Sequence, residues 1–98
     1  MSISVQIEGR IATLSLDERF NFEIHRDFRD AYSKCKPNSA FVIDMKRVEY
    51  LDSSALGMLL LLREYAGADK ADVRIINCKS MVERLLKVAN FDRLFKIT

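Results

Sequence analysis

Two adjacent hydroxyl side chains, Ser53 and Ser54, follow Asp52 and open a mostly apolar segment that ends at Tyr65. A polar side chain at the start of a helix accepts hydrogen bonds from free backbone N–H groups, so Asp52 or Ser53 has an ordinary role as a cap. A serine there is also suited to phosphorylation, because the helix dipole favours negative charge at its amino end. Accessibility of the hydroxyl decides between these two roles.

A helical projection of this segment separates a wide apolar face from a mixed face. At about 100° per residue, the face predicted to be buried contains Ser54, Ala55, Met58, Leu59, Leu61, Leu62, Tyr65 and Ala66. The opposite face contains Ser53, Leu56, Gly57, Leu60, Arg63 and Glu64. Its two charged residues indicate contact with water. We therefore expect Ser53, rather than Ser54, to be the accessible hydroxyl.

Leu56 and Leu60 are apolar residues on this predicted solvent-facing side. Single exposed leucines are ordinary, but here they flank Gly57, which costs a helix about 1 kcal/mol relative to alanine. A glycine lets a partner approach closely. We interpret this side as a docking face that surrounds a modifiable hydroxyl and consists of Asp52, Ser53, Leu56, Gly57, Leu60, Arg63 and Glu64.

Other chemistry has little support in the sequence. His25 is the only histidine, and Cys35 and Cys78 do not form a CxxC pair. There is neither a glycine-rich phosphate loop nor a nucleophile elbow. We expect no enzymatic activity, no catalytic residue, no metal site and no cofactor. The two cysteines are interpreted as free, partly buried thiols.

Composition restricts the class of protein. The chain has 98 residues, of which 49% are hydrophobic and 31% charged, with a formal net charge of +2. This near-balance of positive and negative charge argues against a protein built mainly to bind nucleic acid. The amino terminus does not resemble a signal peptide, and the longest apolar run, Met58 to Leu62, is too short to span a bilayer. We expect a cytoplasmic protein without membrane insertion.

The residues around the serine segment predict alternating strands and helices. Alternation over the first 16 residues predicts a hairpin with Glu8-Gly9 as its turn. An apolar stripe then predicts a helix capped by Asn21, with inward residues Ile24, Phe28, Ala31, Tyr32 and Cys35. Short apolar strands follow at 40–44 and 72–78, and Gly67 is expected to end the serine helix between them.

A third helix is predicted to start at Ser80, with Glu83 completing a capping box. Its inward stripe is expected to be Val82, Leu85, Leu86 and Ala89. The tail from Phe91 reads as a short helical turn and an edge strand.

This order predicts one α/β domain over residues 1–98. We expect a mixed sheet of four to five strands, with one antiparallel strand from the hairpin and helices packed on one face. The carboxyl ends of crossover strands gather at one edge of such a sheet, where ligands commonly bind. Residues 17–21, 44–53 and 78–80 should meet there.

The stretch "VIDMKRVEYLDSSALGMLLLL" resembles the signature of the STAS domain family, the bacterial anti-sigma factor antagonists. That signature is an apolar strand ending in Asp, a connector, and then Asp and two hydroxyl residues that open an apolar helix. The resemblance extends over essentially the whole chain and implies an anti-anti-sigma factor. Ala55 departs from it, because many members have glycine there.

In this family, a partner serine kinase phosphorylates the hydroxyl residue that follows the Asp, and a serine phosphatase reverses the modification. The resemblance therefore implies phosphorylation at Ser53, after Asp52, with Asp44 ending the preceding strand. The kinase is often the anti-sigma factor itself, which the unphosphorylated protein sequesters. STAS domains also serve as constitutive subunits of lipid or solute transport complexes, in which Ser53 would be only a cap.

Overall fold

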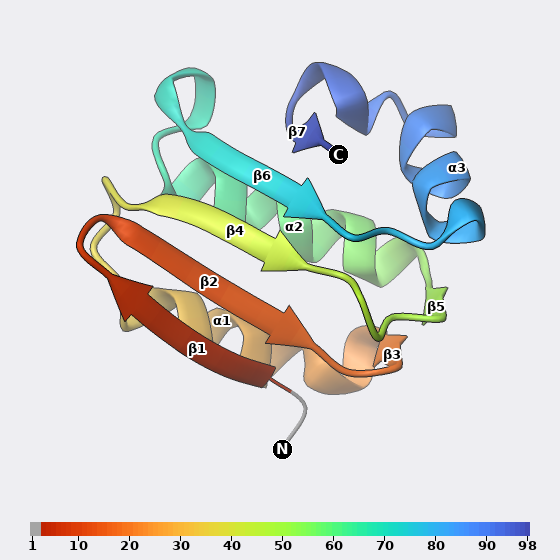
Figure 1. Ribbon diagram of the computed structural model, residues 1–98, viewed down its shortest axis with the longest axis horizontal. Coiled ribbons are helices and arrows are strands. Elements are labelled where there is room, and N and C mark those ends of the chain that lie inside the picture. The colour runs from red at the N-terminus through yellow and green to blue at the C-terminus, as the bar shows by residue number, and fades with distance from the viewer. Residues whose placement is uncertain (1–2) are drawn as a thin grey trace.

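A five-stranded mixed sheet forms the centre of the computed structural model, which describes residues 3–98 (Figure 1). The strand order is β1-β2-β4-β6-β7. β1 pairs with β2 antiparallel, and the remaining neighbours are parallel. The predicted mixed α/β sheet is confirmed, with five strands. These strands are β1 (Ile3–Glu8), β2 (Ile11–Leu16), β4 (Ala40–Asp44), β6 (Asp72–Ile76) and β7 (Lys96–Ile97).

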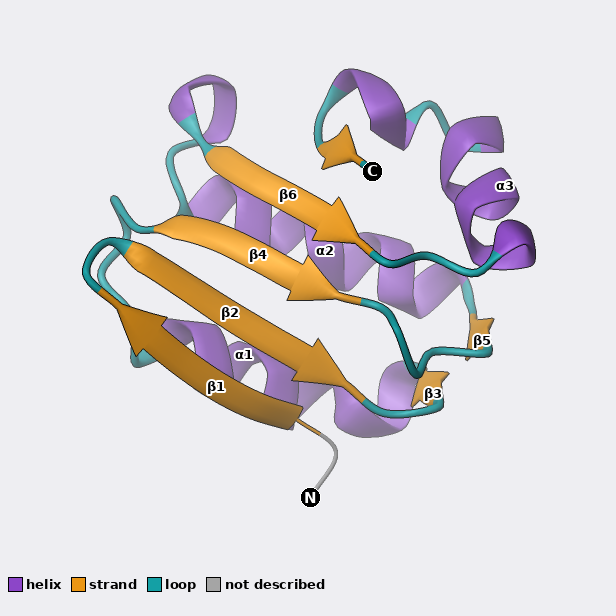
Figure 2. Ribbon diagram, viewed as in Figure 1, coloured by secondary structure: helices purple, strands orange, loops and turns teal. Residues whose placement is uncertain are grey.

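Helices α1 (His25–Ser33) and α2 (Ser53–Tyr65) cover one face of the sheet (Figure 2). Side chains along the strands alternate accordingly. Phe41 and Ile43 of β4 are buried under the helices, whereas Val42 between them is only partly covered. This alternation is the expected consequence of one packed and one open face. The prediction of helices on one face is confirmed.

The remaining elements complete the carboxyl-terminal half. Helix α3 (Ser80–Val88) begins beyond the carboxyl end of β6 (Figure 1). A short helical turn and the edge strand β7 follow it, as predicted. The 3₁₀ turns are η1 (Phe22–Ile24), η2 (Ala68–Lys70) and η3 (Phe91–Arg93). Within residues 3–98, no helix is long and apolar enough to cross a membrane.

The turn of the first hairpin lies one residue later than predicted. Glu8 still pairs with Ile11, so the turn residues are Gly9 and Arg10 and not Glu8 and Gly9. Gly9 has φ +61°, a left-handed conformation that glycine adopts without steric cost. The apolar alternation marked the strands correctly, but it does not show at which pair the ladder stops.

The predicted capping box of α3 is wrong. Lys79 precedes the helix, and the Glu83 N–H donates to the Lys79 carbonyl at 2.9 Å. The Glu83 carboxylate lies 3.1 Å from the Lys87 ammonium, one helical turn ahead. Glu83 therefore takes part in an i,i+4 ion pair, which competes with capping for the same side chain. Leu85 is also wrongly predicted as inward, since it is 43% exposed.

Candidate functional site

The connectors that follow β2 and β4 meet at one edge of the sheet. Two short parallel strands, β3 (Arg19–Phe20) and β5 (Tyr50–Leu51), join there. The N–H groups of Glu49 and Tyr50 both donate to the Glu18 carbonyl, at 2.8 and 3.1 Å. Strands of two residues carry no periodicity, so the sequence predicted the meeting of these segments but not the pairing.

The loop after β6 joins the same edge. One carboxylate oxygen of Asp44 accepts hydrogen bonds from the Lys46 backbone N–H at 2.9 Å and from the Asn77 amide at 3.1 Å. Lys79 reaches Glu49 at 3.6 Å. Such exposed ion pairs contribute little, so the hydrogen bonds do most of the positioning. The predicted convergence of three segments before α2 is confirmed.

Asp52, and not Ser53, caps helix α2. Asp52 has extended backbone, with φ −114° and ψ −176°, and its carboxylate accepts a hydrogen bond from the Ala55 N–H at 3.0 Å. Ser53 is the first helical residue and is exposed, whereas Ser54 is half-buried. The predicted accessibility of Ser53 is confirmed. Gly67, with φ +117°, follows the helix end as predicted.

Two leucines of α2 lie on faces other than those predicted. Leu61, expected in the core, is 60% exposed, and Leu56, expected in solvent, is half-buried against the core. Leu60 is exposed as predicted, at 38%. A projection assumes one flat boundary between core and water. The covering of α2 is uneven instead, because α1 contacts it on one side and leaves Leu61 open.

The other residues of the predicted docking face differ in their exposure to solvent. Gly57 and Glu64 are exposed, and Asp52 is half-buried beside Ser53. The Arg63 side chain is only 18% exposed, and its guanidinium lies 3.1 Å from Asp69. Arg63 therefore already has an ion-pair partner within the chain. Partner contact by Asp52, Ser53, Leu56, Gly57, Leu60, Arg63 and Glu64 stays a prediction.

An open apolar groove of about 580 Å³ runs between α1 and α2, which we call the α1–α2 groove. One side comes from η1 and α1 and the other from α2. Its lining residues are Phe22, His25, Phe28, Arg29, Tyr32, Ser54, Gly57, Met58, Leu60 and Leu61. Of these, only Gly57 and Leu60 belong to the docking face predicted from the sequence, so most of this groove was missed.

A series of aromatic contacts fixes the spacing of the two helices. Phe28 contacts Tyr32 with ring centroids 5.5 Å apart, and Tyr32 contacts Tyr65 of α2 at 5.2 Å. The Tyr65 hydroxyl donates to the Cys35 carbonyl at 2.6 Å, just beyond α1. Aromatic pairs of this kind stabilise by about 0.5–1.5 kcal/mol beyond their burial. The floor of the α1–α2 groove is therefore preformed.

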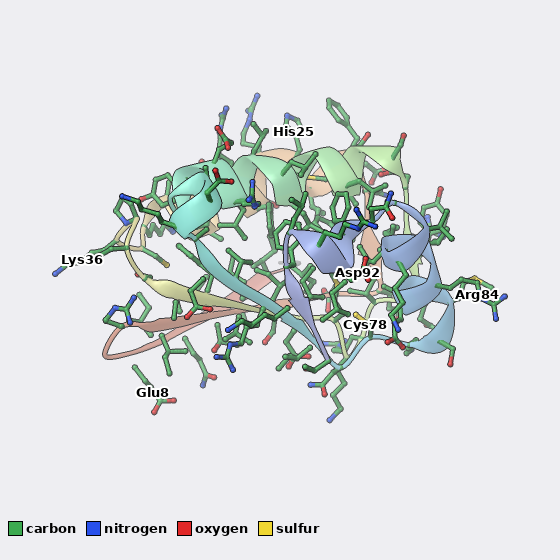
Figure 3. The ribbon with its side chains drawn as sticks, turned by 90° about the horizontal axis from the view of Figure 1, so that it is seen from above. Glu8, His25, Lys36, Cys78, Arg84 and Asp92 are labelled. Atoms are coloured by element: carbon green, nitrogen blue, oxygen red, sulfur yellow. The ribbon has the colours of Figure 1, made fainter. Side chains whose placement is uncertain are left out.

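Phe22 forms an exposed wall of the α1–α2 groove and is 61% accessible. Its ring stacks on His25 at 4.2 Å, with an interplanar angle of 13°. His25 also donates from Nδ1 to the Phe22 carbonyl at 2.7 Å. Figure 3 shows His25 on the outer side of the helical layer, away from the sheet. Phe22 precedes the apolar stripe of α1, so no periodicity drew attention to it.

The two thiols are poorly suited to nucleophilic chemistry. Burial, together with the nearby Glu83 carboxylate, raises the pKa of the Cys78 thiol to about 11. Burial also raises the pKa of the Cys35 thiol. Both cysteines are free. Since the thiolate is the reactive form, the raised pKa values lower the share of reactive thiolate in both side chains near neutral pH.

Comparisons with known proteins agree with this fold. A family model described as "Mlab, STAS domain" matches residues 3–97. A STAS-domain containing protein from Pseudomonas aeruginosa strain UCBPP-PA14 is 45% identical over 92 residues, which is 93% of this chain and 91% of that protein.

Two solved structures have the same fold at low sequence identity. A proposed anti-sigma factor antagonist from Thermotoga maritima aligns with a TM-score of 0.83 and 21% identity, over 97% of this chain and 84% of that chain. The anti-sigma factor antagonist SpoIIAA, in its unphosphorylated form, aligns with a TM-score of 0.81 and 14% identity, over 99% and 88%.

Proposed function

Because this chain belongs to the STAS domain family, we propose that it is a protein-binding switch controlled by phosphorylation of Ser53. In its unmodified form it sequesters an anti-sigma factor or a similar regulatory kinase, and so releases the target of that protein. The kinase adds phosphate to Ser53 and a serine phosphatase removes it. No catalytic step by this chain is required.

The position of Ser53 is the observation that carries this proposal. Its hydroxyl is exposed at the amino end of α2, and Asp52 provides the cap in its place. The hydroxyl is therefore available to a kinase without loss of a capping hydrogen bond. SpoIIAA, which shares the fold, is known in unphosphorylated and phosphorylated forms. That precedent supports Ser53 as the modified residue.

The energetics favour a change in binding over a change in fold. An exposed phosphate at a helix amino end is stabilised by about 0.3–1 kcal/mol. It adds a charge of about −1.5 to −2 beside Asp52 and the α1–α2 groove. Burying such a charge in an interface without a cationic partner costs several kcal/mol. Since each 1.4 kcal/mol is about tenfold in affinity, one phosphate is enough to abolish binding.

Phosphopeptide mapping tests the site. The wild-type chain and its Ser53→Ala and Ser54→Ala variants would be purified from the cells that normally make the protein, with phosphatases inhibited. We expect one phosphate on Ser53 in the wild type and in Ser54→Ala, and none in Ser53→Ala. Phosphate on Ser54 alone, or no phosphate in any form, would contradict the proposal. The latter result would favour a constitutive subunit of a transport complex.

A further inference from the structure

We propose that the α1–α2 groove binds one acidic amphipathic helix of the partner protein. This inference rests on the proposed function, since it names the feature of the partner that the switch recognises. It differs from the docking face expected from the sequence, with which it shares only Gly57 and Leu60. Phe22, Arg29 and Leu61 belong to the groove, whereas Leu56 and Arg63 do not.

The shape of the α1–α2 groove favours a helix over a small molecule. Its walls are themselves open to water, since Phe22 is 61% and Leu61 60% exposed. Small-molecule sites usually bury most of the ligand surface, which such open walls cannot do. A groove between two neighbouring helices instead accepts a third helix, whose side chains fit between the ridges.

Gly57 lowers the α2 side of the groove. A Cβ atom built at this position meets nothing within 4 Å. The absence of a side chain is therefore not required by the fold, and alanine would give a more stable helix. What the glycine provides is space for close approach of another backbone. An incoming helix would make use of that space.

The charges that line the α1–α2 groove are of one sign. Arg29 lines it, and the five ion pairs found among residues 3–98 do not include Arg29. Within this described part of the chain, no aspartate or glutamate lines the groove. The amino end of α2, beside Ser54, adds no free positive charge, because the Asp52 carboxylate caps it. An aspartate or glutamate on the incoming helix would complement the charge of Arg29.

The same charges explain how a phosphate on Ser53 would act. Ser53 directly precedes the groove residue Ser54. A phosphate there would place negative charge at one end of a groove that otherwise attracts an acidic helix. The groove would remain intact, but the phosphate would add to the negative charge of Asp52 at that end and repel an acidic helix. Repulsion of this kind weakens at high salt, because mobile ions screen exposed charges.

A crosslinking experiment tests the occupant. Phe22 is replaced by benzoylphenylalanine in the full chain, which keeps an aromatic ring at that wall. Val88, exposed on α3, receives the same replacement as a matched control. Both proteins are irradiated in the cells that normally make them. We expect only the Phe22 position to capture a protein segment with apolar residues at i, i+3 or i+4, and i+7, and with at least one acidic residue.

A synthetic peptide copying the captured segment then tests the charge. Arg29→Glu should lower its affinity at least tenfold, and replacing the peptide's acidic residue by lysine should restore binding to Arg29→Glu. Arg84→Glu, on α3, is the matched control and should leave affinity within twofold. Capture of a lipid, of a second copy of this chain or of a segment without this pattern would overturn the inference. So would no capture above the Val88 control.

The outcomes distinguish this inference from the proposed function. Phosphate on Ser53 without a helix in the groove would overturn the groove assignment and leave the switch. A captured acidic helix whose affinity is unchanged by phosphate on Ser53 would overturn the switch and leave the groove.

Discussion

Two of the surfaces that expose apolar side chains among residues 3–98 differ in almost every other respect. One is the α1–α2 groove. The other is the α3 stripe, formed by Met81, Leu85 and Val88 at 70%, 43% and 75% exposure. The stripe is more exposed than the groove, yet the hollow beside it, of about 430 Å³, is lined mainly by polar and charged residues. Among these are Glu83 and Lys87, which pair with each other.

The comparison shows that exposure alone is a weak sign of a binding site. Scattered apolar side chains are normal on protein surfaces. The α1–α2 groove combines exposure with a preformed aromatic floor, a glycine and a cation without an ion pair among the described residues. It also lies beside an accessible serine.

Filling the groove should have the largest effect. Gly57→Leu places a large side chain where none now meets a neighbour, so the chain should fold at least as stably while the partner helix is blocked. We expect partner affinity to fall about a hundredfold, which corresponds to roughly 2.7 kcal/mol. Gly57→Ala should raise stability by about 0.5–1 kcal/mol. Isothermal titration calorimetry and denaturant melts measure both. If Gly57→Leu bound the partner as tightly as the wild type does, the α1–α2 groove would have no better support as a binding site than the α3 stripe.

A charge placed on each surface provides the paired test. Leu61→Asp and Val88→Asp both change exposed side chains, so each should alter the free energy of unfolding by about 0.5 kcal/mol or less. Only Leu61→Asp should weaken partner binding, by about tenfold, because it puts a carboxylate among the groove's apolar contacts. Equal losses of affinity from both variants would mean that the α3 stripe is part of the interface.

The amino end of α2 predicts a smaller, purely structural effect. Asp52→Ala removes the acceptor for the Ala55 N–H and should cost about 1 kcal/mol of stability. Ser53→Ala removes no capping bond and should stay within about 0.5 kcal/mol of the wild type. Thermal melts of the two variants at the same protein concentration show which of the two residues caps the helix. A larger loss from Ser53→Ala would make Ser53 the cap and weaken its role as a free hydroxyl.

The smallest expected effect concerns the Cys78 thiol, close to Glu83 of α3. With its pKa raised to about 11, the thiol should react with iodoacetamide very slowly at pH 7. The rate should rise with pH, since the thiolate fraction grows until the pH passes the pKa. Unfolding in urea should remove the protection, because burial is its main cause. Rapid alkylation of the folded chain at pH 7 would contradict this.

The sequence predicted the parts of the fold that depend on local periodicity. The two strands of the hairpin, the apolar stripe of α1 from Ile24 to Cys35, strand β4 and the end of α2 before Gly67 were correct. The strand predicted at 72–78 is β6, which ends two residues earlier, at Ile76. The sequence did not predict the features that depend on contacts between distant parts of the chain. The exposure of Leu61 depends on how far α1 reaches over α2, and the pairing of β3 with β5 involves only two residues in each strand.

The sequence likewise predicted only part of the candidate site. The position of Ser53 followed from its place in the helix, because the first turn of α2 is fixed by its own cap. The groove could not be foreseen, because half of its lining comes from η1 and α1. Phe22 gave only a weak signal, as an aromatic residue beside the Asn21 cap and outside the stripe. Pairing two helices requires knowledge of the crossovers that bring them together.

The most direct test is the affinity of the captured partner for the chain with and without a phosphate on Ser53. The phosphorylated chain would be made with phosphoserine incorporated at position 53 alone, and its melting temperature compared with that of the unmodified chain. We predict unchanged melting within about 2–4 °C, equivalent to less than 1 kcal/mol, and at least a hundredfold weaker binding that partly recovers at high salt. Equal affinity of the two forms would contradict the switch.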